Sequence, residues 1–174
     1  MRFETFGPVE IPRPNRLIAQ NPNGFWEVVE ELCEGLSAAC GCYLFAAKSS
    51  GGPTPYPWYV GQTNKRSFRT ECFDHQKLTH YQIALVDYKR VTPVLFLMAR
   101  RTNGGAFSKP SKNGYPDIDK LEEMLIGMAF IRNRKLRNVQ GTAHLRDLVL
   151  PGVINSPMGN PGKPAIMLKG TLGL

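Results

Sequence analysis

The sequence predicts a mixed α/β (α+β) fold in which a three-stranded antiparallel sheet is flanked by helices. Two hydrophobic patterns lead to this prediction. Short runs of apolar, aromatic and β-branched residues alternate with longer stretches whose apolar residues recur at helical spacing. Clusters of Gly and Pro separate the two kinds of segment. With 174 residues, of which 42% are hydrophobic and 21% charged, the chain can bury a core without disulfides.

We expect one compact core with an extended arm at each end of the chain. An N-terminal arm and a first helix would occupy residues 1–38, and the core would occupy residues 39–140. A short helix at 143–149 and a Pro/Gly-rich tail would complete residues 141–174. Both arms are rich in proline, which fixes φ and removes a backbone donor. Their composition therefore predicts extended chain.

The first half of the chain predicts a helix followed by a β-hairpin. The helix is expected over 25–36, and the two strands over 41–48 and 58–62. The apolar stripe of the helix consists of Phe25, Val28, Val29, Leu32 and Leu36. Residues 49–57 contain five Gly or Pro residues, which favours a hairpin loop between the strands.

The second half of the core predicts a helix, a buried strand and another helix. The first of these helices is expected over 65–80. The most apolar run of the chain, at 93–100, is typical of a central strand covered on both faces. A long basic loop over 100–116 leads to a helix over 116–134. That helix is apolar nearly all round, so we expect most of it to be buried.

The charge of the chain favours a polyanionic partner. The formal net charge is +8 and the pI is about 9.5, a balance that is common in nucleic-acid-binding proteins. No apolar run approaches the roughly 18 residues that a membrane span needs, and the N-terminus does not resemble a secretory signal. We therefore expect a cytoplasmic protein with no membrane partner. The four cysteines lack the paired spacing of a structural zinc site, so we interpret them as free thiols.

Two short motifs in the predicted hairpin each place a tyrosine near a glycine. Gly41-Cys42-Tyr43 opens the first strand, and Tyr59-Val60-Gly61 lies near the end of the second. Arginines follow on the next helix, and Glu122 heads a Glu-x-x-Leu-Ile run on the last helix of the core. The order of these motifs resembles the GIY-YIG nuclease domain, over about residues 39–140. Gly-Cys-Tyr stands in place of Gly-Ile-Tyr, and Tyr-Val-Gly is a variant of Tyr-Ile-Gly.

The resemblance implies an endonuclease that hydrolyses phosphodiester bonds in DNA with Mg²⁺ or Mn²⁺ as cofactor. Such hydrolysis needs a base for the attacking water and positive charge at the phosphate. The catalytic residues that the resemblance implies are Tyr43, Tyr59, Arg69, His75 and Glu122. One phenol, usually the first, would be the base, Arg69 would bind the phosphate, and Glu122 would hold the metal ion. Glu123 is the alternative ligand, and His75 would replace a family residue matched here by Phe73.

A second set of residues is expected to bind the substrate. It consists of Gly61, Arg66, Lys109, Lys112 and Asn138. Arg66 is also an alternative to Arg69, and Asn138 resembles the distal asparagine of the family. The expected partner is double-stranded DNA, cut in a restriction-type or structure-selective manner. The arms, the basic loop or a homodimer would supply sequence readout.

Two other functions fit the same motifs. One is a non-catalytic nucleic-acid-binding module on the same fold, and the other is a nuclease toxin.

Overall fold

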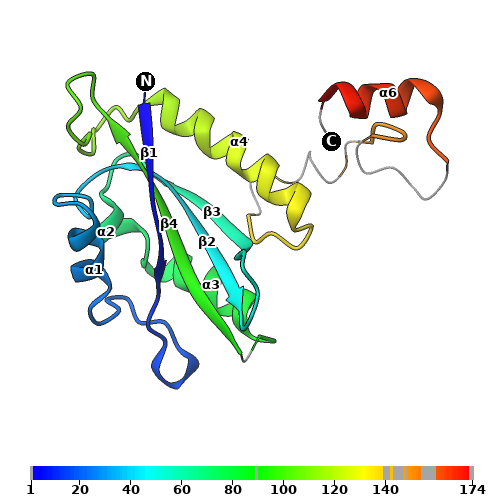
Figure 1. Ribbon diagram of the computed structural model, residues 1–174. Helices are drawn as coiled ribbons and strands as arrows, with labels where there is room; N and C mark the ends of the chain where they lie inside the picture. The colour runs from blue at the N-terminus through cyan, green and yellow to red at the C-terminus, as the bar shows by residue number, and fades with distance from the viewer. Residues whose placement is uncertain are drawn as a thin grey trace. The chain divides into compact units, whose positions relative to one another are not determined.

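A computed structural model describes residues 2–88, 90–138, 142, 147, 149–153 and 160–172. Contacts between residues divide the chain into two compact units, Met1–Asn138 and Val139–Leu174. The first unit has a mixed α/β fold with an open antiparallel sheet (Figure 1). Within the described ranges, no helix is both long and apolar enough to cross a membrane.

The described part of the second unit contains the ten-residue helix α6 (Lys163–Leu172). The expectation of an extended tail is therefore wrong for these residues. Pro164 lies in the first turn of α6, where its missing N–H is tolerated, and most of the following residues are good helix formers. The helix predicted at 143–149 falls largely outside the described residues.

The sheet has four strands in the order β1-β4-β2-β3, and every neighbouring pair is antiparallel. The strands are β1 (Arg2–Glu10), β2 (Gly41–Ser49), β3 (Tyr56–Thr63) and β4 (Val91–Arg101). The expectation of three strands is therefore wrong by one. The β2–β3 hairpin and the central, apolar strand β4 lie where the sequence predicts them. The end of the sheet where β1 and β2 begin and β3 and β4 end gathers residues from all four strands.

The additional strand β1 lies in the segment that the composition predicts to be an arm. It pairs with β4 along its length, and its register shifts where Gly7 and Pro8 interrupt the ladder. An edge strand tolerates proline at such a bulge, because an outward-facing N–H there needs no partner. Pairing with β4 thus converts a proline-containing arm into an edge strand.

Three helices cover one face of the sheet: α1 (Phe25–Leu32), α2 (Phe68–Glu71) and α3 (His75–Leu85). The largest fully buried side chains of this core are Trp26, Tyr43, Tyr81, Phe25, Phe45, Phe68, Leu36, Leu95 and Leu97. Helix α1 is shorter than predicted. Val28 and Leu32 of its predicted stripe are about half exposed, because Trp26 takes the place in the core.

The helix predicted over 65–80 is divided into α2 and α3. Ser67 and Thr70 form a reciprocal capping box at the start of α2. Asp74 caps α3 by accepting the backbone N–H of Lys77 at 3.0 Å. The chain changes direction between the two helices, so residues after Asp74 face other neighbours than a continuous helix would give them.

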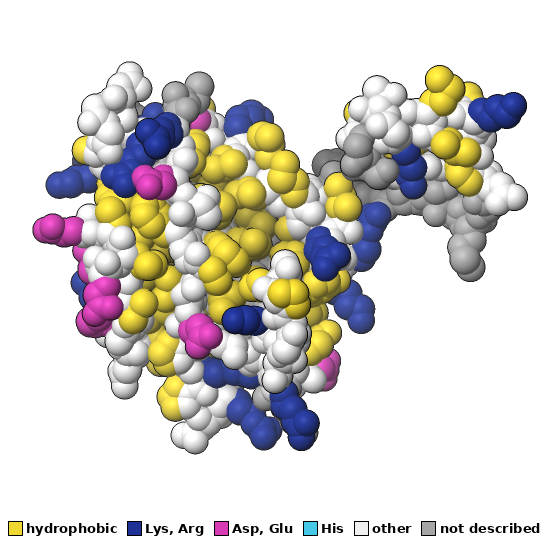
Figure 2. Space-filling model, viewed as in Figure 1, with side chains coloured by type: hydrophobic (Ala, Val, Ile, Leu, Met, Phe, Trp, Pro, Cys, Tyr) yellow, Lys and Arg dark blue, Asp and Glu magenta, His cyan; other side chains and the backbone are white. Residues whose placement is uncertain are grey.

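Helix α4 (Pro116–Arg132) packs on the opposite face, against β2 and β3. Its buried side chains are Ile118, Ile126, Ala129 and Phe130. Met124, Met128 and Ile131, however, are 59%, 60% and 64% exposed. The expectation of a mostly buried helix is therefore wrong, because α4 has the sheet on one side only. Figure 2 shows a broad apolar surface on this face of the molecule.

The basic loop between β4 and α4 is held at the end of β3 by Asn64. The side chain of Asn64 accepts the backbone N–H of Tyr115 at 2.6 Å and donates to Asp119 at 3.0 Å. Its backbone carbonyl accepts the N–H of Ser111 at 3.2 Å. These bonds fix the loop beside the strand that carries Tyr59.

Candidate functional site

The two tyrosines of the hairpin motifs lie side by side on the sheet. The ring centroids of Tyr43 on β2 and Tyr59 on β3 are 6.3 Å apart. Tyr43 is the register partner of Gly61. A Cβ at Gly61 would lie 2.3 Å from Cζ of Tyr43 and 2.4 Å from its hydroxyl oxygen. The glycine of the Tyr-Val-Gly motif therefore makes room for the Tyr43 ring, which gives it a packing role.

Burial keeps the phenols of this cluster protonated. Tyr43 and Tyr81 are fully buried, which raises the pKa of each well above 10. Among the described residues neither hydroxyl has a partner in hydrogen-bond geometry. The Tyr43 hydroxyl nevertheless lies close enough to the hydroxyls of Tyr59 and Tyr81 to lower the pKa of each, against the effect of burial. Tyr59 is partly exposed, and its pKa is raised by burial and then by Glu122.

The carboxylate with the strongest effect on Tyr59 is Glu122 of α4, whose side chain bonds to Gln62 of β3. Burial raises the pKa of Glu122, a hydrogen bond from the Gln62 side chain opposes the shift, and Asp119 adds to it. The Gln62 side-chain oxygen is buried and has no hydrogen-bond partner among the described residues. Glu123 is instead exposed and pairs with Lys120 at 2.8 Å. Of the two glutamates, Glu122 is therefore the one that faces Tyr59.

Lys77 of α3 is a cation whose charge acts on Glu122. Its ammonium lies 3.3 Å from Glu71, its side chain is mostly buried, and its charge lowers the pKa of Glu122 against the effect of burial. Arg66 approaches Glu71 from the other side, at 3.0 Å, and Asp74 at 3.5 Å. The junction of α2 and α3 thus carries two cations and two carboxylates next to Tyr59.

His80 lies flat against the ring of Tyr59. The two ring centroids are 5.1 Å apart with an interplanar angle of 13°. Burial, followed by the charges of Arg137 and Lys77, lowers the pKa of His80 below its ordinary 6.5. Its Nδ1 is buried and has no hydrogen-bond partner within the described part of the chain. His80 is therefore a neutral imidazole at neutral pH.

Two of the predicted catalytic residues lie apart from this group. Arg69 is on α2, where its backbone N–H bonds to Ser37 and its charge acts on Glu30 of α1. His75 is the first residue of α3 and is exposed. Both predictions follow from the motif resemblance. The helix break at Asp74 sets the positions of Lys77 and His80 on α3, and Asp74, a residue type favoured at helix N-caps, is the sequence signal for this break.

Asn138 steadies the strand that carries Tyr59. Its side chain accepts the N–H of Val60 at 2.9 Å and donates to the carbonyl of Val60 at 2.7 Å. The backbone N–H of Arg137 bonds to the carbonyl of Trp58 at 2.8 Å. Since β3 is an edge strand, these bonds occupy backbone groups that would otherwise face water.

A polar cavity of about 440 Å³ opens beside the group. It is lined by Gln62, Asn64, Lys65, Arg66, Glu71, Asn113, Gly114 and Asp119. The predicted substrate contact Arg66 therefore borders the cavity. Lys109 and Lys112, the other basic residues of that prediction, are exposed on the loop that Asn64 holds in place.

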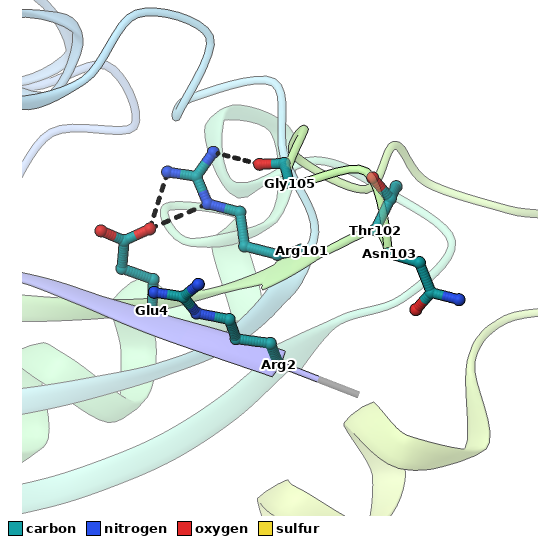
Figure 3. A pocket seen from close by; sticks show the side chains of 6 residues that line it. All are labelled: Arg2, Glu4, Arg101, Thr102, Asn103 and Gly105. Carbon is teal, nitrogen blue, oxygen red and sulfur yellow. Dashed lines mark hydrogen bonds and ion pairs between the residues drawn. The ribbon is translucent and has the colours of Figure 1, made fainter.

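A second polar pocket, of about 550 Å³, lies where β1 begins and β4 ends (Figure 3). Arg101 is held there by Glu4 at 2.7 Å and by the carbonyl of Gly105 at 3.0 Å, and it covers the ring of Phe107. Arg2 lines the same pocket (Figure 3). Arg2 is not among the residues predicted from the sequence, because β1 was not expected, and Arg101 is expected only as part of the basic loop over 100–116.

Among the described residues, no group of three or more His, Cys, Asp or Glu side chains could hold a metal ion. Comparison of the chain with family models, with curated proteins and with solved structures finds no match.

Proposed function

We propose that this chain is a metal-dependent endonuclease of the GIY-YIG type that hydrolyses phosphodiester bonds in DNA. The observation that carries the proposal is the grouping of Tyr59, Glu122, Lys77 and His80 around the edge strand β3. It joins a carboxylate, a cation and a neutral base, which are the parts that phosphodiester hydrolysis needs. The motif resemblance supports the same reading.

The residues at the end of β3 suit a hard divalent cation. Glu122 and the side-chain oxygen of Gln62, which has no partner within the described ranges, are neighbouring oxygen donors, the ligand type that Mg²⁺ and Mn²⁺ prefer. A single carboxylate is enough for Mg²⁺, which keeps several waters and binds substrate phosphate. When bound, the ion would polarise a phosphate oxygen and neutralise part of its charge.

The remaining residues would bind the phosphate and move the proton. The Lys77 ammonium is placed to neutralise charge on the phosphoryl oxygens. Water adds to phosphorus while the bond to the leaving oxygen breaks; His80 takes the proton of the water, and the leaving oxygen keeps the electron pair of the broken bond and takes a proton from solvent. We assign this role to His80 rather than Tyr43, because Tyr43 is fully buried and keeps its own proton. Tyr59 orients the water through its hydroxyl.

The basic end of the sheet would carry the flanking DNA. Arg2 and Arg101 lie at the end where β3 leads into Lys65 and Arg66. Lys109 and Lys112 extend from the loop fixed at the same end. Contacts of this kind neutralise backbone phosphates without reading sequence.

The direct test is a nicking assay on supercoiled plasmid. We expect nicked and linear products with Mg²⁺ or Mn²⁺ and none with EDTA. Because His80 must be neutral to accept a proton, the rate should rise with pH up to the lowered pKa of His80, below 6.5, and stay level above it. Intact plasmid under all conditions contradicts the proposal.

Replacement of Lys77 should show whether the phosphate is bound by Lys77 or by Arg69, the residue that the motif resemblance implies. Lys77→Met removes the charge but keeps the stem, and we expect kcat/KM to fall by about 10²–10³-fold. Glu71 keeps Arg66 as its partner, so the fold should persist. Arg69→Met is the matched control, because the charge of Arg69 acts on Glu30 of α1 and not on Glu122, and it should stay within about threefold of wild type. A larger loss in the Arg69 variant would return the phosphate-binding role to Arg69.

A non-catalytic nucleic-acid-binding module is the alternative favoured by one observation. Phe73, at the position where the family has a His or Tyr, is buried in the core against Phe25 and Trp26. Salt-dependent binding of duplex DNA without any nicking would support this module.

A further inference from the structure

Arg137 is a partly buried cation without a counter-ion among the described residues. Its Nε atom is buried and has no hydrogen-bond partner there, and no carboxylate of those ranges forms an ion pair with it. Two other partly buried arginines are paired. Arg100 lies 2.8 Å from Asp117, and Arg101 lies 2.7 Å from Glu4. A buried charge without a partner disfavours the folded state, so a guanidinium group that is kept in this condition calls for an explanation outside the fold.

The backbone of Arg137 is fixed beside the strand that carries Tyr59. Its N–H donates to the carbonyl of Trp58 at 2.8 Å. The next residue, Asn138, bonds to both the N–H and the carbonyl of Val60. These bonds lie on either side of Tyr59 along β3, so the segment that carries Arg137 is aligned with the candidate site by several hydrogen bonds. A side chain with such support is held in place before any ligand binds.

The charge of Arg137 acts on the imidazole that lies against Tyr59. The rings of His80 and Tyr59 are 5.1 Å apart, and the Nδ1 atom of His80 is buried without a partner in the described part of the chain. After burial, Arg137 and then Lys77 lower the pKa of His80, and Asp74 opposes them. Lys77 reaches the imidazole from α3, whereas Arg137 comes from the segment after α4. Positive charge from two separate elements therefore meets at this ring.

We propose that Arg137 is a second phosphate-binding residue of the candidate site and takes an oxygen of the DNA phosphate beside His80. A guanidinium group presents its N–H donors in a plane and forms bidentate bonds with phosphate, whereas the Lys77 ammonium is a point charge. The bound phosphate would supply the negative charge that the chain does not place next to Arg137. This inference rests on the proposed function, because the substrate of that function is the anion. It adds a residue that the motif resemblance does not imply.

A phosphate titration followed by NMR tests the site without any cleavage. The chain has three histidines, and the exposed His75 at the start of α3 is an internal reference for His80. In EDTA, at neutral pH and constant ionic strength, inorganic phosphate should shift the imidazole signals of His80 saturably and leave those of His75 in place. Arg137→Met should weaken this binding about tenfold or more, and Arg137→Lys should retain part of it. The matched control is Lys135→Met, at an exposed residue of the same segment, and it should bind phosphate like the wild type.

Two further measurements separate a binding role from a structural one. Arg137→Met removes an unpaired charge and keeps an apolar stem, so the variant should unfold at the temperature of the wild type or above it. The pKa of His80, followed by the same NMR signals, should rise in this variant because the charge that lowers it is gone. A variant that fails to fold or unfolds at a clearly lower temperature overturns the proposal, as does an unchanged pKa of His80. His80 signals that do not respond to phosphate in the wild type, or a variant that binds phosphate as tightly as the wild type, overturn it as well.

Plasmid nicking distinguishes a failure of this inference from a failure of the proposed function. In an active wild type, Arg137→Met should lower kcat/KM by about 10–100-fold, and Lys135→Met should stay within about threefold. Full activity in the Arg137→Met chain overturns the role of Arg137 and leaves the nuclease proposal in place. A wild type that never nicks DNA but binds phosphate through Arg137 has the reverse meaning. The nuclease proposal then fails, and the phosphate site belongs to the binding module.

Discussion

Replacing Glu122 by glutamine should reduce DNA cleavage by about 10³-fold or more and leave the fold intact. The expected loss follows from the proposed role of Glu122 as the half-buried carboxylate that acts on Tyr59 and bonds to Gln62, whose side-chain oxygen has no partner among the described residues. A neutral amide is a much weaker ligand for a hard divalent cation. Plasmid nicking under single-turnover conditions, with Mg²⁺ titrated to saturation, measures the effect.

The same substitution should not reduce stability at neutral pH. Burial raises the pKa of Glu122 in the folded chain above its unfolded value. The folded state therefore binds this proton more readily, so the ionised carboxylate is destabilising at neutral pH and becomes less so as the pH falls through the raised pKa. The glutamine side chain of the variant carries no such charge. Thermal unfolding followed as the pH is lowered from neutrality should show a smaller gain on acidification in the variant than in the wild type.

Glu123→Gln is the control for both effects. Glu123 is exposed and pairs only with Lys120 on its own helix, a surface ion pair worth little. Its replacement should leave cleavage and stability close to wild type. Full activity in the Glu122→Gln chain, or a comparable loss in the Glu123→Gln chain, would contradict the assignment of the metal ligand.

Gly61→Ala should lower the free energy of unfolding by about 3 kcal/mol. The added methyl would lie 2.3 Å from Cζ of Tyr43, a ring that is fully buried. Tyr43 has Phe45 and Tyr81 packed in the same core and cannot move aside without displacing them. Urea unfolding followed by fluorescence measures the change.

A second substitution separates this steric effect from a general effect of alanine. Tyr43→Leu should restore part of the stability lost in Gly61→Ala, because the clashing ring is gone. Gly104→Ala, in a surface loop with only Thr102 nearby at 3.9 Å, should change stability by less than about 0.5 kcal/mol. An equally small change for Gly61→Ala would show that the ring does not depend on this glycine.

The elements most accurately predicted from the sequence are those with strong local signals. The β2–β3 hairpin is bounded by Gly- and Pro-rich segments, and its tyrosines alternate with apolar residues, so the pairing of Tyr43 with Gly61 follows from the strands themselves. Strand β1 was missed because Gly7 and Pro8 resemble a loop until pairing with β4 is known. Local composition carries no information about that distant partner.

The residues around Tyr59 are harder to predict from the sequence than the strands. The motif resemblance points to Arg69 and His75, whereas the ring that lies against Tyr59 is that of His80, because α3 begins at a break capped by Asp74. The apolar pattern of α4 likewise indicates burial, but it does not reveal whether the far side of the helix is covered. The exposure of Met128 became visible only with the whole unit folded.

The hydrogen bonds from the segment after α4 to β3 set a limit on how far the chain can be shortened. The Asn133 side chain donates to the carbonyl of Pro57, and the backbone N–H of Arg137 donates to the carbonyl of Trp58. The Asn138 side chain bonds to both the N–H and the carbonyl of Val60. A fragment that ends at Arg132 would leave these backbone groups of the edge strand β3 unpaired, and an unpaired edge can pair with another chain and cause aggregation. A fragment that retains Asn138 keeps these hydrogen bonds to β3, so we expect the shortest fragment suitable for expression to end at Asn138.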